Sequence, residues 1–293
     1  MVNNKPLYLL GYASGIAGAE PGSAEGPIII QNSPYLSTLL EQGIALQWEK
    51  MLQPKPSNAG ILSEVTELCR QLAQSTAKLT TAKQSFVVLG GDHTSAIGTW
   101  SGVAHAKRKE GSLGLIWIDA HMDSHTPETT LSGNLHGMPV ACLLGYGEGA
   151  LTKLCDDLPK LQPENICLIG IRSYEQGEVN LLKKLNVKIF YMDEVKQRGI
   201  TAVLQEAREI VSRNTTGYGI SIDIDSMDPH DAPGTGVAEP DGIVANDLCA
   251  ALTRYAQDPY LIGLEIAEFD PRRDHEHMTE KLVIKLIATV FGS

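Results

Sequence analysis

The chain has 293 residues, of which 43% are hydrophobic and 20% are charged, a composition typical of a globular protein with a large core. A formal net charge of -11 argues against nucleic acid and anionic membrane surfaces as partners. No apolar run approaches the ~20 residues that span a bilayer, and residues 1–8 lack the basic-then-apolar pattern of a signal peptide. We therefore expect no membrane association.

Short apolar segments alternate along the chain with longer segments of helical periodicity. Such alternation predicts an α/β protein with three αβα layers, in which helices cover both faces of a mostly parallel, about eight-stranded sheet. No linker, repeat or low-complexity segment interrupts the pattern, so we expect a single domain over residues 1–293. In chain order, the expected strands are residues 6–10, 45–48, 85–89, 113–118, 166–171, 187–191, 218–224 and 261–266, and the expected helices are 61–79, 96–109, 178–185, 203–212 and 247–256.

Side chains that bind metal ions follow three of the expected strands. In an extended chain, residues at i, i+2 and i+4 point to one side, so the alternating ligands at the ends of strands 113–118 and 218–224 are expected to converge. Gly90 and Gly91 let the backbone turn sharply after strand 85–89. Ligands of parallel sheets bind outside the carboxyl ends of the strands, where these segments should meet. The six candidate metal ligands are His93, Asp119, His121, Asp123, Asp223 and Asp225.

Four carboxylates and two imidazoles favour a borderline-to-hard divalent ion such as Mn²⁺, although the same donors accept Co²⁺ and Ni²⁺. Without cations, the clustered carboxylates would repel one another and shift toward protonation. A carboxylate can also bridge two ions ~3.5–4 Å apart. We therefore expect two Mn²⁺ per chain. An aspartate at a strand end can instead cap a helix or stabilise a turn, and this alternative is favoured for Asp92.

Two further segments carry candidate catalytic groups. His136 lies in the Gly-flanked loop 132–137, where it is either an ordinary loop histidine or, beside a metal site, a proton shuttle with a pKa near neutrality. Glu265 and Glu268 end the strand 261–266, and a site for a cationic head group would need such a carboxylate.

The cysteines indicate a reducing compartment. They are scattered, odd in number and form no C-x-x-C pair, and most lie in apolar segments. This pattern favours buried free thiols and a cytoplasmic protein, with a cysteine nucleophile or a thiolate zinc site as the alternative. The five are Cys69, Cys142, Cys155, Cys167 and Cys249.

Together these motifs resemble the ureohydrolase family, which contains arginases and agmatinases. Residues 90–93, 119–123 and 221–229 look like its three metal signatures, and the resemblance runs from the 25–27 loop to residues 268–271. The loop 132–137 and its spacing from Asp123 are similar to arginases. The resemblance implies an arginase-like fold, a homotrimer or homohexamer, and hydrolysis of L-arginine to L-ornithine and urea.

The roles of the family's residues carry over onto matching positions. In the metal centre, Asp119 and Asp223 would bridge the two ions. In catalysis, Asp123 would orient the attacking hydroxide, His136 would relay a proton and Glu268 would hold the guanidinium. The remaining metal ligands would divide into His93 with Asp123 on one ion and His121 with Asp225 on the other, and the residues at the amino-acid end of the substrate would be His125, Ser132, Asn134 and Glu175.

Three positions depart from the arginase pattern. Arginases usually have Asn at the position of His125, Asp near that of Glu175, and Thr at that of Val237. In arginases, the residues at the positions of His125 and Glu175 contact the α-carboxylate and α-amino groups of the substrate. The alternative is therefore the same chemistry on agmatine, guanidinobutyrate or formiminoglutamate. A third hypothesis is a non-catalytic, arginase-like binding protein. Such proteins usually lose metal ligands, so the presence of all six candidate ligands argues against it.

Overall fold

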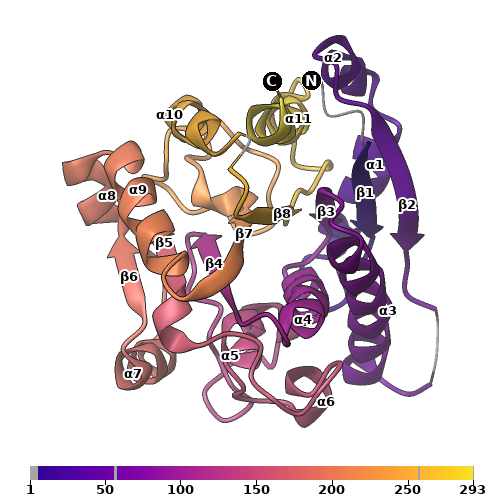
Figure 1. Cartoon of the computed structure of the whole chain (residues 1–293). Helices are drawn as coiled ribbons and strands as arrows, with labels where there is room; N and C mark the ends of the chain where they lie inside the picture. The colour runs from indigo at the N-terminus through magenta and orange to yellow at the C-terminus, as the bar shows by residue number, and fades with distance from the viewer. Residues whose placement is uncertain (1–5, 56–57, 257, 293) are drawn as a thin grey trace.

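The computed structural model describes residues 6–55, 58–256 and 258–292. In these residues eight strands form one sheet, in the order β2-β1-β3-β8-β7-β4-β5-β6, and every neighbouring pair is parallel (Figure 1). All eight predicted strands are confirmed. They are β1 (Leu7–Tyr12), β2 (Leu46–Leu52), β3 (Phe86–Gly90), β4 (Ser112–Ile118), β5 (Ile166–Ile171), β6 (Lys188–Tyr191), β7 (Thr215–Asp223) and β8 (Leu261–Ala267).

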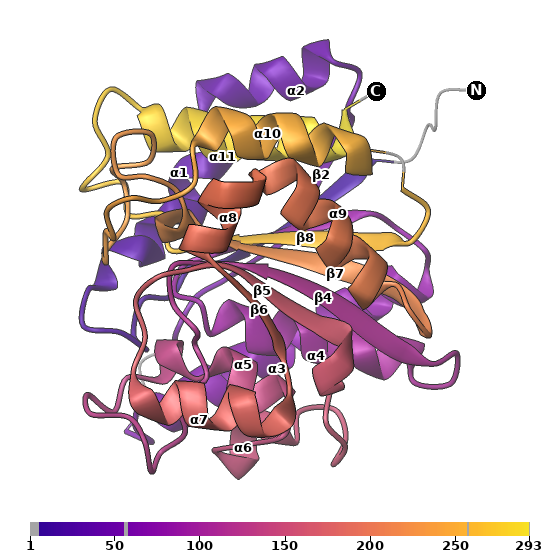
Figure 2. The same ribbon diagram turned by 90° about the vertical axis from the view of Figure 1, so that its left-hand side faces the viewer.

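Helices cover both faces of the sheet, which confirms the predicted three-layer αβα class (Figure 2). One face carries α1 (Gly26–Gln31), α2 (Ser37–Glu41), α8 (Met192–Arg198), α9 (Ile200–Val211), α10 (Ala245–Leu252) and α11 (Met278–Phe291). The other carries α3 (Ile61–Thr81), α4 (Ser95–Lys107), α5 (Pro139–Leu143), α6 (Gly149–Thr152) and α7 (Gln176–Leu185).

The five predicted helices are present, but the long helix α11 was missed. Its buried residues include Leu282, Leu286 and Val290, whose spacing of four positions is that of one helix face. The sequence signal was therefore available. The helix begins after Glu276 and His277, which both have left-handed backbone and sharply redirect the chain after β8.

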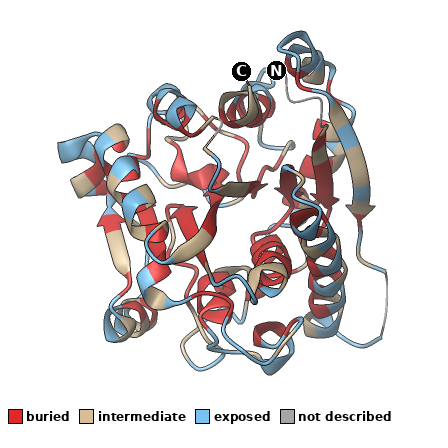
Figure 3. Cartoon of the chain, in the orientation of Figure 1, coloured by how far each residue is buried: buried red, intermediate tan, exposed pale blue. Residues whose placement is uncertain are grey.

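Two apolar cores lie on opposite faces of the sheet, and the central strands are buried on both sides (Figure 3). Along β4, Ile116 and Ile118 belong to one core, whereas Leu115 and Trp117 belong to the other. Alternate side chains of a strand point to opposite faces, so a parallel strand covered on both sides needs a continuous apolar run. This requirement explains why the strands were readable from the sequence.

The sequence led us to expect no membrane-spanning helix and buried free cysteines. Within the described residues, no helix combines the length and the apolar character needed to cross a bilayer. Four of the five cysteines are buried free thiols, as predicted, whereas Cys155 is exposed. The exposed thiol departs from the expectation because its loop, unlike the apolar segments around the others, is polar (Asp156, Asp157).

The strand order gathers the chemically important segments at one edge. The strands β3, β8, β7 and β4 are neighbours in the middle of the sheet, although β8 comes last in the sequence. Their carboxyl ends all point the same way, because the strands are parallel. The segments that follow them, which contain His93, Glu268, Asp225 and Asp119, therefore emerge side by side.

Candidate active site

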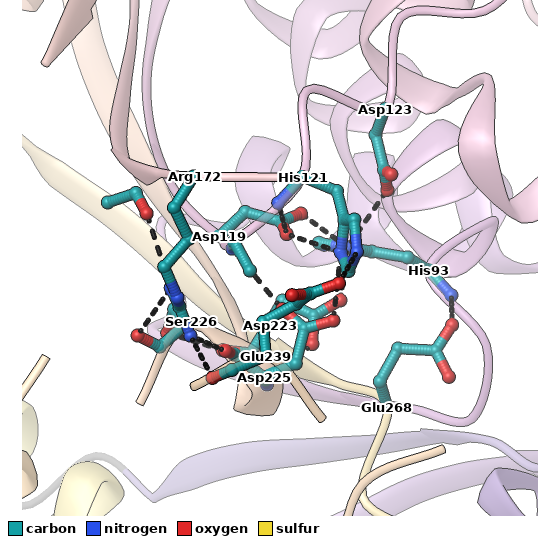
Figure 4. Close-up of polar contacts among 12 residues, drawn as sticks. His93, Asp119, His121, Asp123, Arg172, Asp223, Asp225, Ser226, Glu239 and Glu268 are labelled. Carbon is teal, nitrogen blue, oxygen red and sulfur yellow. Dashed lines mark hydrogen bonds and ion pairs between the residues drawn. The ribbon is translucent and has the colours of Figure 1, made fainter. Parts of the chain in front are cut away.

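Two clusters of potential ligand atoms lie at this edge and share Asp119 (Figure 4). One contains His93, Asp119 and Asp123, and the other contains Asp119, His121 and Asp225. Asp223 adjoins the first cluster, because its Oδ2 lies 3.0 Å from Nδ1 of His93. In the second cluster, Nδ1 of His121 lies 3.0 Å from Oδ2 of Asp225. The structure thus brings together all six side chains predicted as metal ligands.

Local turns, rather than the strand alternation expected from the sequence, aim these side chains. The strand β4 ends at Ile118, and Oδ1 of Asp119 accepts the backbone N–H of His121 at 2.7 Å. Likewise, Oδ1 of Asp223 accepts the N–H of Asp225 at 2.9 Å, at the start of a 3₁₀ turn. An aspartate side chain that bonds the backbone two residues on mimics a turn. The i, i+2 spacing therefore has its physical basis in the turn and not in the pleat.

The surroundings of His93 fit a metal ion. Its Nδ1 faces carboxylate oxygens of Asp119, Asp123 and Asp223 at 3.0–3.3 Å, yet this buried atom has no hydrogen-bond partner in the described part of the chain. Its Nε2 lies 3.0 Å from Oγ of Ser221, whose hydroxyl donates to Glu265. The Ser221 oxygen therefore accepts from Nε2–H, and the lone pair of Nδ1 points into the cluster of carboxylates. A second partner on the far nitrogen is typical of metal-binding histidines.

Burial destabilises the charged form of most carboxylates in the clusters, whereas hydrogen bonds with His121 and His93 outweigh burial at Asp119 and lower its pKa. Burial, followed by the charges of Asp225 and Asp119, raises the pKa of Asp223 well above its usual range. Burial and the charge of Asp119 also raise the pKa of Asp123. Two divalent cations among these groups would remove both causes of instability, because they cancel the mutual repulsion and replace lost hydration.

Two of the predicted catalytic residues have strained backbone. Asp123 and Glu268 are non-glycine residues with φ of 46° and 64°. Such conformations cost about 1–3 kcal/mol and persist only where the surroundings enforce them, often at functional sites. Around Glu268 the enforcing contacts are visible: its N–H donates to the carbonyl of Gly91 at 2.7 Å, and its Oε1 accepts the N–H of His93 at 2.9 Å.

His136 lies beside Glu268 in a shaped seat. Its Nδ1 is 3.2 Å from Oε1 of Glu268, and its N–H donates to the carbonyl of Ala17 at 3.3 Å. The ring rests on Gly18, where an added Cβ would lie 3.2–3.3 Å from three ring atoms. Burial lowers the pKa of His136, but the hydrogen bond with Glu268 and the neighbouring carboxylates outweigh burial and raise it to about 9.

Asp92 supports this seat. Its side chain forms a turn rather than a helix cap: Oδ1 accepts the N–H of Thr94 at 3.1 Å, and Thr94 is itself the residue that precedes α4. Its Oδ2 also accepts the N–H of Ala17 at 3.3 Å. The carboxylate therefore ties the loop under His136 to the turn that presents His93.

A cavity of about 310 Å³ opens over the two clusters of potential ligand atoms. All predicted site residues except the more deeply buried His93 and Asp119 line it, including Ser132 and Asn134. On its wall, Nε2 of His125 lies 3.6 Å from Oε2 of Glu175. The predicted substrate-binding residues therefore share one pocket with residues of both clusters of potential metal ligands.

Two acidic residues of this wall, Glu178 and Glu239, were not predicted from the sequence. Glu178 lies 3.5 Å from His125 and forms a reciprocal capping box with Glu175 at the start of α7. The spacing Glu175-x-x-Glu178 was the signal that could have revealed it. None of the described lining residues is Lys or Arg, so the cavity favours a cation.

Comparisons with known proteins agree with this geometry. The profile of the arginase family matches residues 6–292. Arginase from Brevibacillus brevis is 36% identical over 297 residues, which cover 99% of this chain and 98% of that protein. The crystal structure of Bacillus subtilis arginase has a TM-score of 0.90 at 33% identity, and that of Entamoeba histolytica arginase in complex with L-ornithine has 0.89 at 28%, each covering 99% of both chains. The resemblance is thereby confirmed, and the chain belongs to the arginase family.

Proposed function

We propose that this protein is an arginase that hydrolyses L-arginine to L-ornithine and urea with two Mn²⁺ ions per chain. The observation that carries the proposal is the pair of ligand clusters that share Asp119 beneath an acidic cavity. The family relatives named above are arginases, and the Entamoeba histolytica structure holds L-ornithine, the amino-acid product of this reaction.

The six ligands would hold the ions. When bound, two such ions lower the pKa of a shared water and so supply a nucleophile at neutral pH. Asp123, whose carboxylate faces both His93 and the cavity, orients that nucleophile. The strained backbone of Asp123 fixes the direction of its side chain.

Glu268 and His136 act on the substrate. The carboxylate of Glu268 is held by the N–H of His93, and it binds the guanidinium through charge-assisted hydrogen bonds. His136 donates a proton to the leaving amine, because an amine leaves readily only when it is protonated. The distance of 3.2 Å between Nδ1 of His136 and Oε1 of Glu268 places the proton donor next to the carboxylate that binds the guanidinium.

The other end of the cavity would bind the amino-acid part of the substrate. Ser132, Asn134 and His125 offer hydrogen-bond donors to an α-carboxylate, and Glu175 offers an acceptor to an α-amino group. His125 replaces the usual Asn and lies between Glu175 and Thr129. This replacement favours a second candidate, the same chemistry on agmatine, guanidinobutyrate or formiminoglutamate.

One experiment tests both candidates. Protein stripped of metal is reconstituted with Mn²⁺, Co²⁺ or Ni²⁺ and offered each compound, and release of urea, or of formamide from formiminoglutamate, is measured. We expect the highest kcat/KM for arginine with Mn²⁺. Agmatine differs from arginine by the missing α-carboxylate, so this pair reports on the His125 wall. No product above the metal-free control for any compound would refute hydrolysis.

The finer features of this function are also proposals. We propose that residues 1–293 form a single domain and that the protein acts in the cytoplasm as a homotrimer or homohexamer. Light scattering coupled to size-exclusion chromatography gives the mass in solution, and a monomer of 31.6 kDa would contradict the assembly. Limited proteolysis that yields two stable fragments would contradict the single domain.

A further inference from the structure

Glu239 is an acidic side chain whose carboxylate approaches a metal-binding histidine from the far side. Its Oε1 lies 3.6 Å from Nε2 of His121, while Nδ1 of the same ring faces Asp225 at 3.0 Å and Asp119 at 3.6 Å. Both side chains are about one-quarter exposed at the cavity wall. The His121 ring therefore lies between an acidic ligand cluster on one nitrogen and a single carboxylate on the other.

The loop that carries Glu239 is held firmly. Arg172, just after β5, donates Nη2–H to the carbonyls of Glu239 at 2.8 Å and Asp225 at 2.7 Å, and Nε–H to the carbonyl of Pro240 at 2.9 Å (Figure 4). One guanidinium thus joins the backbone of Glu239 to that of the ligand Asp225. Because a rigid guanidinium joins both segments, it fixes the backbone position from which the Glu239 side chain reaches His121.

The two metal histidines differ in how the far nitrogen is satisfied. For His93, the partner is the buried hydroxyl of Ser221, backed by Glu265. For His121, the acceptor that faces Nε2 is the carboxylate of Glu239. A carboxylate on the far nitrogen fixes the tautomer and ring orientation and makes the ligating nitrogen more basic.

We propose that Glu239 is a positioning residue for the second metal ion: its carboxylate, 3.6 Å from Nε2 of His121, attracts the Nε2–H and so favours the tautomer whose Nδ1 lone pair faces Asp119 and Asp225. The inference rests on the proposed dinuclear site. It gives Glu239 a role through His121 rather than through the substrate, although the side chain also lines the cavity.

The test compares three variants by calorimetric titration of metal-free protein with Mn²⁺. Removal of such a carboxylate typically weakens metal affinity about 10–100-fold, so E239A should bind one ion that much more weakly and the other as the wild type does. E239Q keeps an oxygen acceptor without the charge and should lose less. The control D241N removes a charge from the same loop, where Asp241 pairs with Lys196 and not with the ligands, and should bind like the wild type.

Two further readouts separate positioning from other roles. The melting temperature of metal-free E239A should match that of the wild type, since a loss would indicate a structural role of the loop. At saturating Mn²⁺, the KM for arginine should be unchanged in E239A. Wild-type affinity for both ions in E239A, or a raised KM with unchanged metal affinity, would overturn the role of Glu239. Fewer than two ions in the wild type would instead refute the dinuclear site itself.

Discussion

Replacing Gly18 with alanine tests how the His136 ring is held. An added Cβ would lie 3.2 Å from Cε1 and 3.3 Å from both ring nitrogens of His136, closer than the 3.4–4 Å of ordinary contact. The backbone of Gly18 is not left-handed, so alanine can adopt its conformation. The substitution therefore pushes on the ring without breaking the loop.

The size of the effect follows from the displacement. A ring that retreats to an ordinary separation of about 3.7 Å moves roughly 0.4–0.5 Å, away from the position it holds 3.2 Å from Glu268. Since a misplacement of about 1 Å can cost about 10²-fold in rate, we expect kcat to fall roughly 5–10-fold. The metal ligands are untouched, so Mn²⁺ content should not change.

The assay is urea release from arginine by the reconstituted protein, with metal content measured on the same sample. The control is G149A at the start of α6, where an added Cβ meets no atom within 4 Å and kcat should equal that of the wild type. Wild-type kcat in G18A would refute the proposed seat of His136. A fall in kcat that tracks loss of Mn²⁺ would refute the assignment of His136 as a proton donor outside the metal shell.

Three other predictions concern stability and catalysis. In β7, the Cβ of G219A would lie 2.0 Å from the Trp100 ring, so urea denaturation should show a loss of about 3 kcal/mol, and a loss under 1 kcal/mol would contradict this packing. Burial raises the pKa of Asp156, but hydrogen bonds led by Lys160 outweigh it and hold the pKa at about 2. A carboxyl group with a lowered pKa stabilises the fold above its unfolded pKa of about 3.9, and this stabilisation is lost as pH falls through 2. After allowance for solvent screening, D156N should therefore be less stable than the wild type by about 1 kcal/mol at pH 7. The difference in stability between D156N and the wild type should narrow below about pH 4. H136N should lower kcat at full Mn²⁺ occupancy, and loss of Mn²⁺ in this variant would place His136 in the metal shell.

The sequence by itself determined the fold class and the donor types of the site. Parallel strands buried on both faces need continuous apolar runs, and covering helices need a 3.6-residue period, so both are legible locally. The segments 90–93, 119–123 and 221–229 carry their donors within a few residues of a strand end, where the ligands of parallel sheets bind. All six candidate ligands meet in the structure for this reason.

Only the tertiary structure decided which side chains from distant parts of the sequence contact the candidate metal ligands and His136. The insertion of β8 between β3 and β7 brings Glu268 to the N–H of His93, 175 positions away. The contacts of Glu239 with His121 and of Gly18 with the His136 ring likewise join separate loops. No periodicity in the sequence links such residues. Strand order and loop packing arise from burial of the whole sheet, so a local sequence pattern does not indicate which distant residues lie beside it in the fold.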